Sequence, residues 1–258
     1  MRNNRVYKIV IGILLLIIIL EGLFIIITRP KKARKIPVAI KAKIAIVIDD
    51  WGYNLNNLPS LEQIKYPLTV AVLPNLVYSQ IISEELYKRG FEIILHLPME
   101  PREKYRLERN TILTSMDDTT IRNILEQDLT NIAYARGVSG HMGSRATEDP
   151  SVMETIFKDL KRRRLYFLDS IVSSKSVCSD LARRMGLGFA KRDVFLDNKE
   201  EPAYIRGQLY KLKLLARTKG RAIGIGHDRR ITLQVLKEAM PEMEKEGYRF
   251  VFVSELER

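Results

Sequence analysis

The sequence contains very little cysteine and histidine. Its 258 residues include one cysteine, Cys178, which excludes a disulfide scaffold and a zinc site built on cysteines. Only three histidines are present, His96, His141 and His227, so any histidine-based metal site must use some of them. Glycine and proline, at 14 and 10 residues, show no excess, which excludes a collagen-like or wholly disordered chain.

Common cofactor and nucleophile motifs are also missing. The sequence has no Walker A loop and no G-x-G-x-x-G loop, so it gives no signal for nucleotide binding. Ser144 and Ser173 are weak candidates for a nucleophile, because no G-x-S-x-G elbow surrounds either of them. Any chemistry is therefore expected to rest on the acidic residues and the three histidines.

The positive charge of the chain is concentrated at its N-terminus. The formal net charge is +12, and residues 1–43 hold 10 of the 43 lysines and arginines but one of the 31 acidic residues. The remaining 33 basic and 30 acidic residues lie in 44–258 and almost balance. We therefore expect no nucleic-acid partner for the folded part. The sequence does not specify an oligomeric state.

An apolar run near the N-terminus is long enough to cross a membrane. Residues 9–27 read IVIGILLLIIILEGLFIII, with Glu21 as the one charge, toward the end of the run. No Ala-x-Ala cleavage site follows, so we predict an uncleaved anchor over residues 1–28 and a basic linker over 29–43. A buried core helix is the alternative, which the basic flanks and the apolar character of the whole run disfavour.

The charges beside this run bear on its orientation in a membrane. Three basic residues precede the run, and five follow it between positions 29 and 35. By the positive-inside rule this count slightly favours a cytoplasmic location for the C-terminal domain.

Residues 44–258 are predicted to form one α/β domain. Short apolar runs alternate with amphipathic helices, which indicates βα units, a parallel sheet and the size of a single β/α barrel. The predicted strands lie in 44–48, 68–74, 91–98, 137–144, 165–170, 188–198, 221–227 and 248–254. The predicted helices are 78–90, 117–135, 148–164, 176–186, 200–219 and 230–246.

Polar residues gather at the C-terminal ends of these predicted strands. They are Asp49, Asp50, His96, His141, Asp169 and His227. In a barrel, all those ends open on one face, which is where such folds carry their active sites. All three histidines of the chain fall there, so we expect a functional site on this face.

The residue types at these ends suit a hydrolytic metal site. Of the adjacent carboxylates of Asp49 and Asp50, one can bind a cation while the other stays free as a base. An Asx-capped turn is the alternative for this pair. Two histidines and one aspartate make a three-ligand set with an open position, typical of hydrolytic zinc. His227, on another strand, is expected to lie across the pocket as a general acid.

Several of these residues also have a purely structural interpretation. His96 can be a hydrogen-bonded strand-end histidine, and His141 can belong to a glycine-rich turn. Asp169 is predicted to orient or tune a histidine, with helix capping as the alternative. Cys178 is expected to be a small buried residue in a helix.

Six segments together resemble the divergent polysaccharide deacetylase family, a branch of the NodB-like carbohydrate esterases. They are IVIDDWG (46–52), HLPME (96–100), GHMGSRATED (140–149), FLDS (167–170), RDVFLDN (192–198) and GIGH (224–227). The resemblance implies a distorted β/α barrel of about seven parallel strands over 44–258, preceded by one transmembrane helix. It also implies an exported domain, which favours an extracytoplasmic location at the cell membrane despite the charge count.

The same resemblance implies an activity and residue roles. The activity is metal-dependent removal of N-acetyl groups from an N-acetylated cell-envelope polysaccharide, with one divalent ion, Zn²⁺ or a similar metal. Asp49 resembles the catalytic base, Asp50 a metal ligand and His227 the acid. Arg145 is expected to contact substrate or to orient Asp49.

The sequence departs from the family pattern at two positions. The wider family takes both ligand histidines from one H-x-x-x-H segment, but the residue four positions after His96 is Glu100. His141 is therefore expected to be the second ligand histidine. The divergent branch usually has asparagine before that histidine, and this chain has Gly140.

Two alternatives to this activity remain. One is a catalytically inactive glycan-binding or envelope-scaffold protein that keeps the fold. The other is a different metal hydrolase, such as a phosphoesterase, which the lack of a second carboxylate-rich cluster disfavours.

Overall fold

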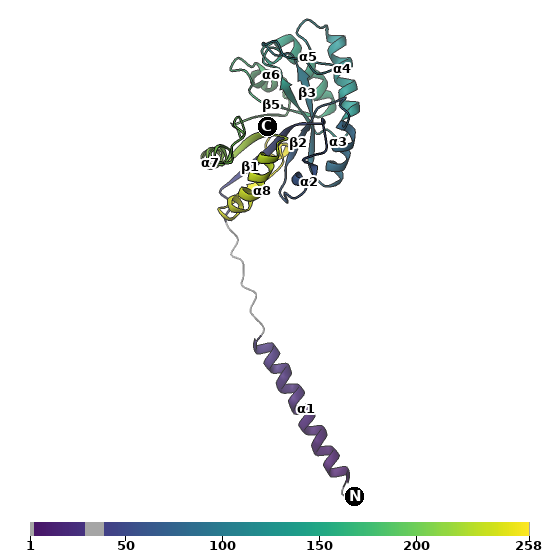
Figure 1. The fold of residues 1–258 in the computed structure, drawn as a ribbon, viewed down its shortest axis with the longest axis vertical. Helices are drawn as coiled ribbons and strands as arrows, with labels where there is room; N and C mark the ends of the chain where they lie inside the picture. The colour runs from purple at the N-terminus through teal and green to yellow at the C-terminus, as the bar shows by residue number, and fades with distance from the viewer. Residues whose placement is uncertain (1–2, 29–38, 258) are drawn as a thin grey trace. The chain divides into compact units, whose positions relative to one another are not determined.

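The computed structural model describes residues 3–28 and 39–257 (Figure 1). The chain divides into two compact units, Met1–Pro37 and Val38–Arg258, and each is described by itself. The predicted linker, 29–43, lies largely outside the described residues.

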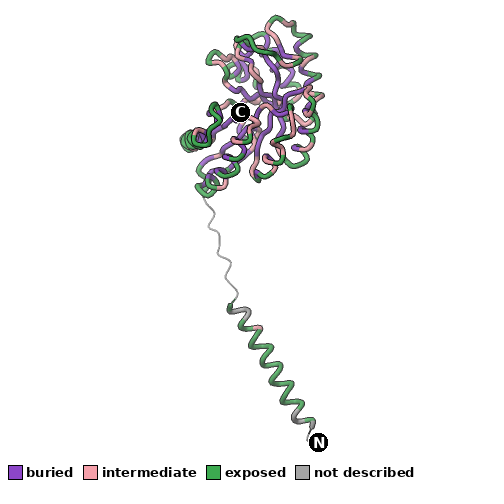
Figure 2. Tube along the Cα trace, viewed as in Figure 1, coloured by how far each residue is buried: buried purple, intermediate pink, exposed green. Residues whose placement is uncertain are grey.

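The described part of the first unit is a single helix, α1 (Asn3–Thr28). Its apolar window Tyr7–Phe24 spans 18 residues with a mean hydropathy of 2.4, and none of that window is buried (Figure 2). Among the described residues, α1 is the one helix long and apolar enough to cross a membrane. A signal sequence near an N-terminus would meet the same criterion.

The second unit is built on one parallel sheet. Within residues 39–257 the sheet has nine strands in the order β6-β5-β4-β3-β2-β1-β8-β7, and β9 pairs with β1. The strands are β1 (Ala42–Trp51), β2 (Thr69–Val72), β3 (Glu92–Met99), β4 (Gly137–Met142), β5 (Tyr166–Asp169), β6 (Phe189–Lys191), β7 (Val194–Phe195), β8 (Arg221–His227) and β9 (Tyr248–Phe250). All these strand pairs are parallel, which confirms the predicted α/β fold with a distorted barrel. The sheet is curled into a half-barrel, and within residues 39–257 it has nine strands where about seven were predicted.

The helices lie around the outside of the curled sheet (Figure 1). They are α2 (Leu58–Leu61), α3 (Ser79–Lys88), α4 (Asp118–Asn131), α5 (Pro150–Arg163), α6 (Cys178–Met185), α7 (Pro202–Lys219) and α8 (Arg230–Lys245). All six predicted helices are present, as α3 to α8, and α2 is an additional short one. Cys178 is fully buried at the start of α6, as expected.

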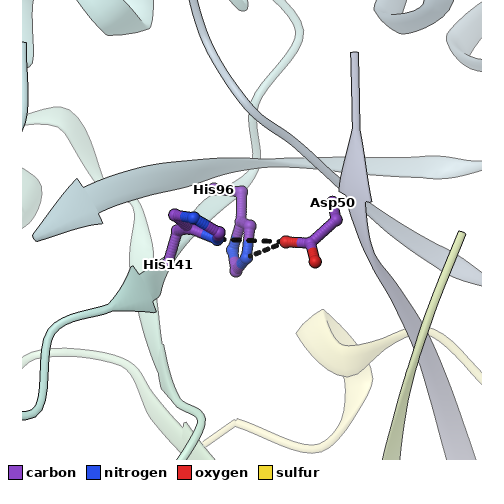
Figure 3. Close-up of side chains that lie close together, drawn as sticks. All are labelled: Asp50, His96 and His141. Carbon is purple, nitrogen blue, oxygen red and sulfur yellow. Dashed lines mark hydrogen bonds and ion pairs between the residues drawn. The ribbon is translucent and has the colours of Figure 1, made fainter. Parts of the chain in front are cut away.

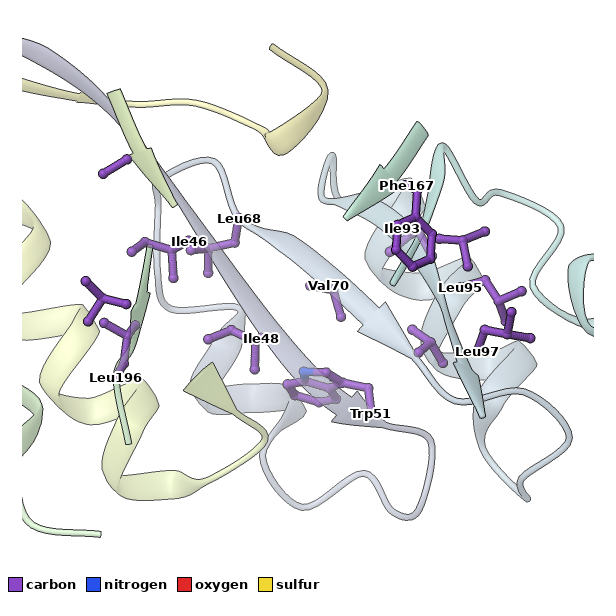
Figure 4. Packing of buried hydrophobic residues seen from close by; sticks show 14 of the residues in the cluster. Ile46, Ile48, Trp51, Leu68, Val70, Ile93, Leu95, Leu97, Phe167 and Leu196 are labelled. Atoms are coloured by element: carbon purple, nitrogen blue, oxygen red, sulfur yellow. The ribbon is translucent and has the colours of Figure 1, made fainter. Parts of the chain in front are cut away.

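Alternate residues of each strand pack on opposite faces of the sheet. On β1, Ile44, Ile46 and Ile48 belong to the large cluster under the helices, while Ala45 and Val47 belong to a smaller cluster inside the half-barrel. Figure 4 shows the outward row, with Ile46, Ile48 and Trp51 beside side chains from neighbouring strands. Because both faces are apolar, the strands are buried throughout, and the inward rows meet inside the curl.

One predicted strand, 188–198, is two strands in the structure. β6 pairs with β5, whereas β7 pairs with β8, at the opposite end of the sheet order. The chain therefore crosses the opening of the half-barrel between these strands. The crossing is fixed by Asp193, whose N–H donates to the Ile223 carbonyl (2.9 Å) and whose carboxylate accepts from the Ile223 N–H (2.9 Å).

A buried carboxylate, Glu92, forms a hydrogen-bond network inside the half-barrel, near the N-terminal ends of the strands. Glu92, the first residue of β3, accepts hydrogen bonds from the Thr69 hydroxyl (2.8 Å), the Tyr166 hydroxyl (3.0 Å) and the Ser254 N–H (3.3 Å). It thereby joins β2, β3, β5 and the C-terminal segment. Such networks at this face of a barrel serve stability.

Replacing Glu92 by alanine is expected to lower the free energy of unfolding by about 2–3 kcal/mol, because it leaves buried donors unpaired. The measurement is denaturant unfolding of the full chain in detergent, followed by fluorescence of Trp51, the single tryptophan, which is fully buried. Glu84→Ala is the matched control, since Glu84 forms an exposed ion pair with Lys88 (3.6 Å) and should change stability by less than about 0.5 kcal/mol. Equal effects of both substitutions would contradict the network.

Candidate active site and metal centre

Four of the predicted site residues lie on strands whose alternate side chains face the inside of the half-barrel, and their own side chains face inward too. Asp49 follows Ala45 and Val47 on β1, and His227 follows Ile223 and Ile225 on β8. His96 follows Ile94 on β3. His141 lies on β4, two residues after Ser139, and Asp49 is paired in register with His227. The four side chains therefore converge at the C-terminal end of the half-barrel.

Asp50 reaches the same place by a local irregularity of β1. If side chains alternated strictly along β1, the Asp50 side chain would face outward. The register between β1 and β2, however, shifts between Ile48 and Trp51. Three steps on β1 (Ile48 to Trp51) oppose two on β2 (Val70 to Val72), which is a β-bulge. Asp50 itself has φ of 66°, a left-handed conformation that is uncommon for a non-glycine residue. Such backbone strain is often found at functional sites.

Asp50, His96 and His141 form a compact set of ligand atoms (Figure 3). One oxygen of Asp50, Oδ1, lies 3.2 Å from His96 Nε2 and 3.0 Å from His141 Nδ1. The three ligand atoms are all within 4.8 Å of one another. The imidazole rings meet edge to face with centroids 5.0 Å apart. The structure thus brings together the three residues predicted as metal ligands.

The histidine rings are held by their surroundings. His96 is buried, and its Nδ1 is hydrogen-bonded to the Ser139 hydroxyl (2.8 Å), which leaves Nε2 facing Asp50. A bond of this kind fixes the orientation of a ligand histidine. After His141 the chain turns sharply at Gly143, where φ is +77° and a Cβ atom would lie 3.0 Å from Met99 Cβ.

This donor set fits a divalent transition metal. Two imidazole nitrogens and one carboxylate oxygen match the three protein ligands of hydrolytic zinc sites, which keep an open position. Burial opposes the charge of Asp50, but the hydrogen bonds from His141 and His96 hold its pKa far below the ordinary value. The carboxylate is therefore ionised, as a metal ligand must be.

Asp49 is a buried carboxylate with a free oxygen. Its side chain is 4 % exposed, Oδ2 lies 3.8 Å from His96 Nε2, and Oδ1 has no hydrogen-bond partner among residues 39–257. Burial raises the pKa of Asp49, while the neighbouring His96 lowers it by a smaller amount. Oδ1 of Asp49 therefore does not cap a turn.

His227 has a carboxylate partner, Asp197, that was not among the predicted site residues. Asp197 Oδ1 lies 2.8 Å from His227 Nδ1, and Asp197 Oδ2 accepts from the His227 N–H (2.8 Å) and the Thr232 hydroxyl (2.7 Å). Burial lowers the pKa of His227, but the hydrogen bond and charge of Asp197 outweigh it, so the pKa is raised. The available signal was the segment 192–198, which ends in Leu-Asp-Asn after the crossing strand.

Asp169 makes no hydrogen bond or ion pair with a histidine within residues 39–257, so no contact supports the predicted role of orienting one. Its neighbour Phe167 packs in the outer cluster, so Asp169 continues the outward row of β5 and turns away from the histidines. Its carboxylate accepts from the Ile171 N–H (2.8 Å) and the Ser176 hydroxyl (2.7 Å), which fixes the loop after β5. Asp169 does not cap α6 either, because the N-cap residue of α6 is Val177.

Arg145 does not orient Asp49. Its Nη1 lies 3.1 Å from Glu100 Oε1, and no hydrogen bond or ion pair joins it to Asp49 within residues 39–257. A contact of the exposed Arg145 side chain with substrate stays a prediction.

Arg192 is close enough to Asp49 for their charges to interact. Its guanidinium donates to the carbonyl oxygens of Ser170 (2.6 Å) and Ile171 (2.9 Å) and lies 3.8 Å from the ring centroid of Phe195. Burial lowers the pKa of Arg192, and the charges of Asp169 and Asp49 act in the opposite direction. No motif in the sequence pointed to a role for Arg192.

The chain matches one family model over most of its length. The model describes divergent polysaccharide deacetylases and covers residues 46–257. The chain is also 36% identical over 199 residues to the uncharacterized protein YibQ of Escherichia coli K12. The match covers 77% of this chain and 62% of YibQ, so this chain spans less than two thirds of that relative.

Solved structures share the fold at lower identity. An uncharacterized protein of Agrobacterium tumefaciens C58 has a TM-score of 0.81 at 24% identity, covering 88% of this chain and 92% of that one. The catalytic domain of a peptidoglycan N-acetylglucosamine deacetylase of Eubacterium rectale has a TM-score of 0.54 at 16% identity, covering 82% and 88%. A CE4 family pseudoenzyme of Bacillus anthracis has a TM-score of 0.53 at 15% identity, covering 83% and 65%.

Proposed function

Because this chain belongs to the divergent polysaccharide deacetylase family, we propose that it is a metal-dependent hydrolase that removes N-acetyl groups from an N-acetylated cell-envelope polysaccharide. The observation that carries the proposal is one cluster at the C-terminal end of the half-barrel. There, the three potential ligands Asp50, His96 and His141 lie within 4.8 Å of one another, with Asp49 and His227 beside them.

In this proposal Asp50, His96 and His141 hold one divalent cation, Zn²⁺ or a similar metal. A cation bound there would supply Lewis acidity, which polarises an amide carbonyl and lowers the pKa of water. The chain's part is to keep the three ligands in place, through the bulge at Asp50 and the bond from Ser139 to His96. Asp49 and His96 are buried, whereas Asp50, His141 and His227 are partly exposed and thus accessible to water and substrate.

Asp49 and His227 would move the protons. Asp49 Oδ1, buried and without a partner among the described residues, is available to accept a proton from a water molecule. His227 would then donate a proton to the amine that leaves when the amide bond breaks. Asp197 keeps that imidazole oriented and favours its protonated form.

The direct test is acetate release by the purified full chain. The chain in detergent, loaded with Zn²⁺, is incubated with N-acetylated chitin oligomers and peptidoglycan fragments, and free acetate and new amines are measured. We expect both products in equal amounts. No acetate release from the metal-loaded chain on any of these substrates would contradict the proposed activity.

A binding protein without catalysis is the second candidate. It is favoured by the finding that a neighbour with this fold is a pseudoenzyme, so the fold does not by itself imply turnover. A chain that binds one metal and a glycan but releases no acetate would support this candidate.

Asp197→Asn is expected to move the basic limb of the pH–rate profile to lower pH by about one to two units. His227 must be protonated to act as an acid, and Asp197 raises its pKa, so loss of that carboxylate deprotonates His227 earlier as the pH rises. Asp193→Asn is the matched control, because Asp193 contacts Lys219 and Ile223 rather than His227. An unmoved basic limb in Asp197→Asn, with an unchanged melting temperature, would contradict this role.

We also propose that residues 1–28 anchor the protein in a membrane with an extracytoplasmic domain, resting on the exposed apolar helix α1. The full chain should stay in the membrane pellet after washes with high salt and with alkaline carbonate, whereas a chain lacking residues 1–28 should be released. Protease added outside the membrane should digest the domain. Digestion only after lysis would place the domain in the cytoplasm.

A further inference from the structure

An exposed tyrosine stands beside the proposed active site. Tyr53 lies two residues after the end of β1 and three after Asp50, and it is 48 % exposed. The chain turns between them at Gly52, where φ is +131° and a Cβ atom would lie 3.1 Å from Leu76 Cδ1. The Gly52 carbonyl oxygen also accepts from the Tyr78 N–H (3.2 Å). This packing fixes the backbone from which Tyr53 projects, at the C-terminal end of the half-barrel.

The ring of Tyr53 is held in place although much of it is exposed. Its hydroxyl donates to Glu108 Oε1, in the loop that follows β3. That loop is anchored at its base, because the Glu100 N–H donates to the Ile112 carbonyl oxygen (2.9 Å) and the Ile112 N–H to the Pro98 carbonyl oxygen (2.9 Å). Holding an exposed side chain in one orientation costs conformational entropy, and a ring that is already ordered loses less on binding a ligand. Tyr53 is therefore arranged as a binding surface.

Tyr53 lies close to the proposed metal ligands. Burial and the hydrogen bond to Glu108 raise the pKa of the Tyr53 phenol, and the nearby negative charge of Asp50 raises it further. The Asp50 side chain is 33 % exposed, so the cluster is accessible to a ligand from solvent. The exposed ring and the metal cluster thus border the same end of the half-barrel.

We propose that Tyr53 stacks against a sugar ring of the glycan, next to the ring whose amide lies at the metal centre. A tyrosine ring has an apolar face and a polar tip, which suits the C–H groups on the face of a pyranose ring and the hydroxyls at its edge. Tyr53 binds a neighbouring ring because its hydroxyl is bonded to the loop after β3 and not to the ligand cluster. This inference rests on the proposed function, and it makes the substrate a chain of at least two sugars.

The test is calorimetric titration of the zinc-loaded full chain, in a detergent without sugar head groups. All chains carry Asp49→Asn, so that the probes are not consumed. The probes are N-acetylglucosamine and a chitin tetramer. We expect the tetramer to bind at least about tenfold more tightly than the monomer, because only the tetramer reaches Tyr53.

Tyr53→Ala should weaken binding of the tetramer by about tenfold and leave binding of the monomer unchanged, which also shows that the variant is folded. Tyr53→Phe keeps the ring and loses only the hydrogen bond to Glu108, so its affinity should stay within about threefold of the unsubstituted tyrosine. Tyr87→Ala is the matched control. Tyr87 is 49 % exposed, but it lies on α3 and stacks on Tyr134.

The proposal is overturned if the tetramer does not bind, if Tyr53→Ala leaves its affinity unchanged, or if Tyr87→Ala weakens it equally. Acetate release is measured separately, on the chain that retains Asp49. Tetramer binding that depends on Tyr53, without acetate release, would contradict only the proposed hydrolysis. Acetate release without such binding would contradict only the role of Tyr53.

Discussion

Replacing Asp50, His96 or His141 by alanine is expected to lower the affinity for a divalent cation by more than about 100-fold in each case. Each substitution removes one of three ligands, and even indirect partners of such ligands typically contribute about 10–100-fold. The parent chain should bind about one Zn²⁺, because the three ligand atoms lie within 4.8 Å of one another. The measurement is metal content after dialysis, together with competition by a chromophoric chelator.

A graded control comes from Ser139, which contacts the site only through His96. Ser139→Ala removes the hydrogen bond to His96 Nδ1 (2.8 Å) and should lower affinity by about 10–100-fold, less than loss of a ligand. Asp180→Ala, at an exposed carboxylate on α6, should change nothing. Full metal occupancy in all three ligand variants would show that the ion binds elsewhere.

Asp49→Asn and His227→Ala are each expected to reduce the rate of acetate release by about 10²–10⁴-fold while the bound metal is retained. Neither residue belongs to the set of three ligands, yet both are needed to move protons in the proposed reaction. The parent enzyme should show a bell-shaped pH–rate profile. Asp49→Asn should abolish the acidic limb, because that limb reports protonation of the base. His227→Ala should abolish the basic limb, where the acid loses its proton.

The structural alternative makes a different prediction for the same variants. If Asp49 and His227 only stabilise the strand ends, their substitution should lower the melting temperature without a selective loss of rate. Thermal melts beside the kinetics separate the two interpretations. Unchanged rates in both variants would rule out the proposed proton transfers, whereas a large loss of rate at an unchanged melting temperature would support them.

The fold was predictable because its signals are local. Apolar runs such as 44–48 and 221–227, separated by amphipathic helices, require a parallel sheet covered on both faces. The parallel direction then places every strand end on one edge, which is why the histidines could be assigned to a common face. The run 188–198 was misjudged, since its division into β6 and β7 depends on pairing partners at opposite ends of the sheet.

The roles within the site were harder to predict, and Asp169 shows why. In a sheet buried on both sides, inward and outward rows are both apolar, so the sequence does not reveal which row faces the interior. Phe167 and Leu168 look alike as strand residues, yet they belong to different clusters, and Asp169 follows the outward one.

The sequence by itself determined the α/β class, the apolar N-terminal helix and the presence of two carboxylates and three histidines at strand ends. Only the tertiary structure decided which of them meet. The bulge and the left-handed backbone of Asp50 turn its carboxylate to His96 and His141, which are 45 residues apart in the chain. The pairing of Asp197 with His227 likewise joins residues 30 positions apart. Such contacts depend on strand register and on local backbone geometry, and neither leaves a periodic pattern in the sequence.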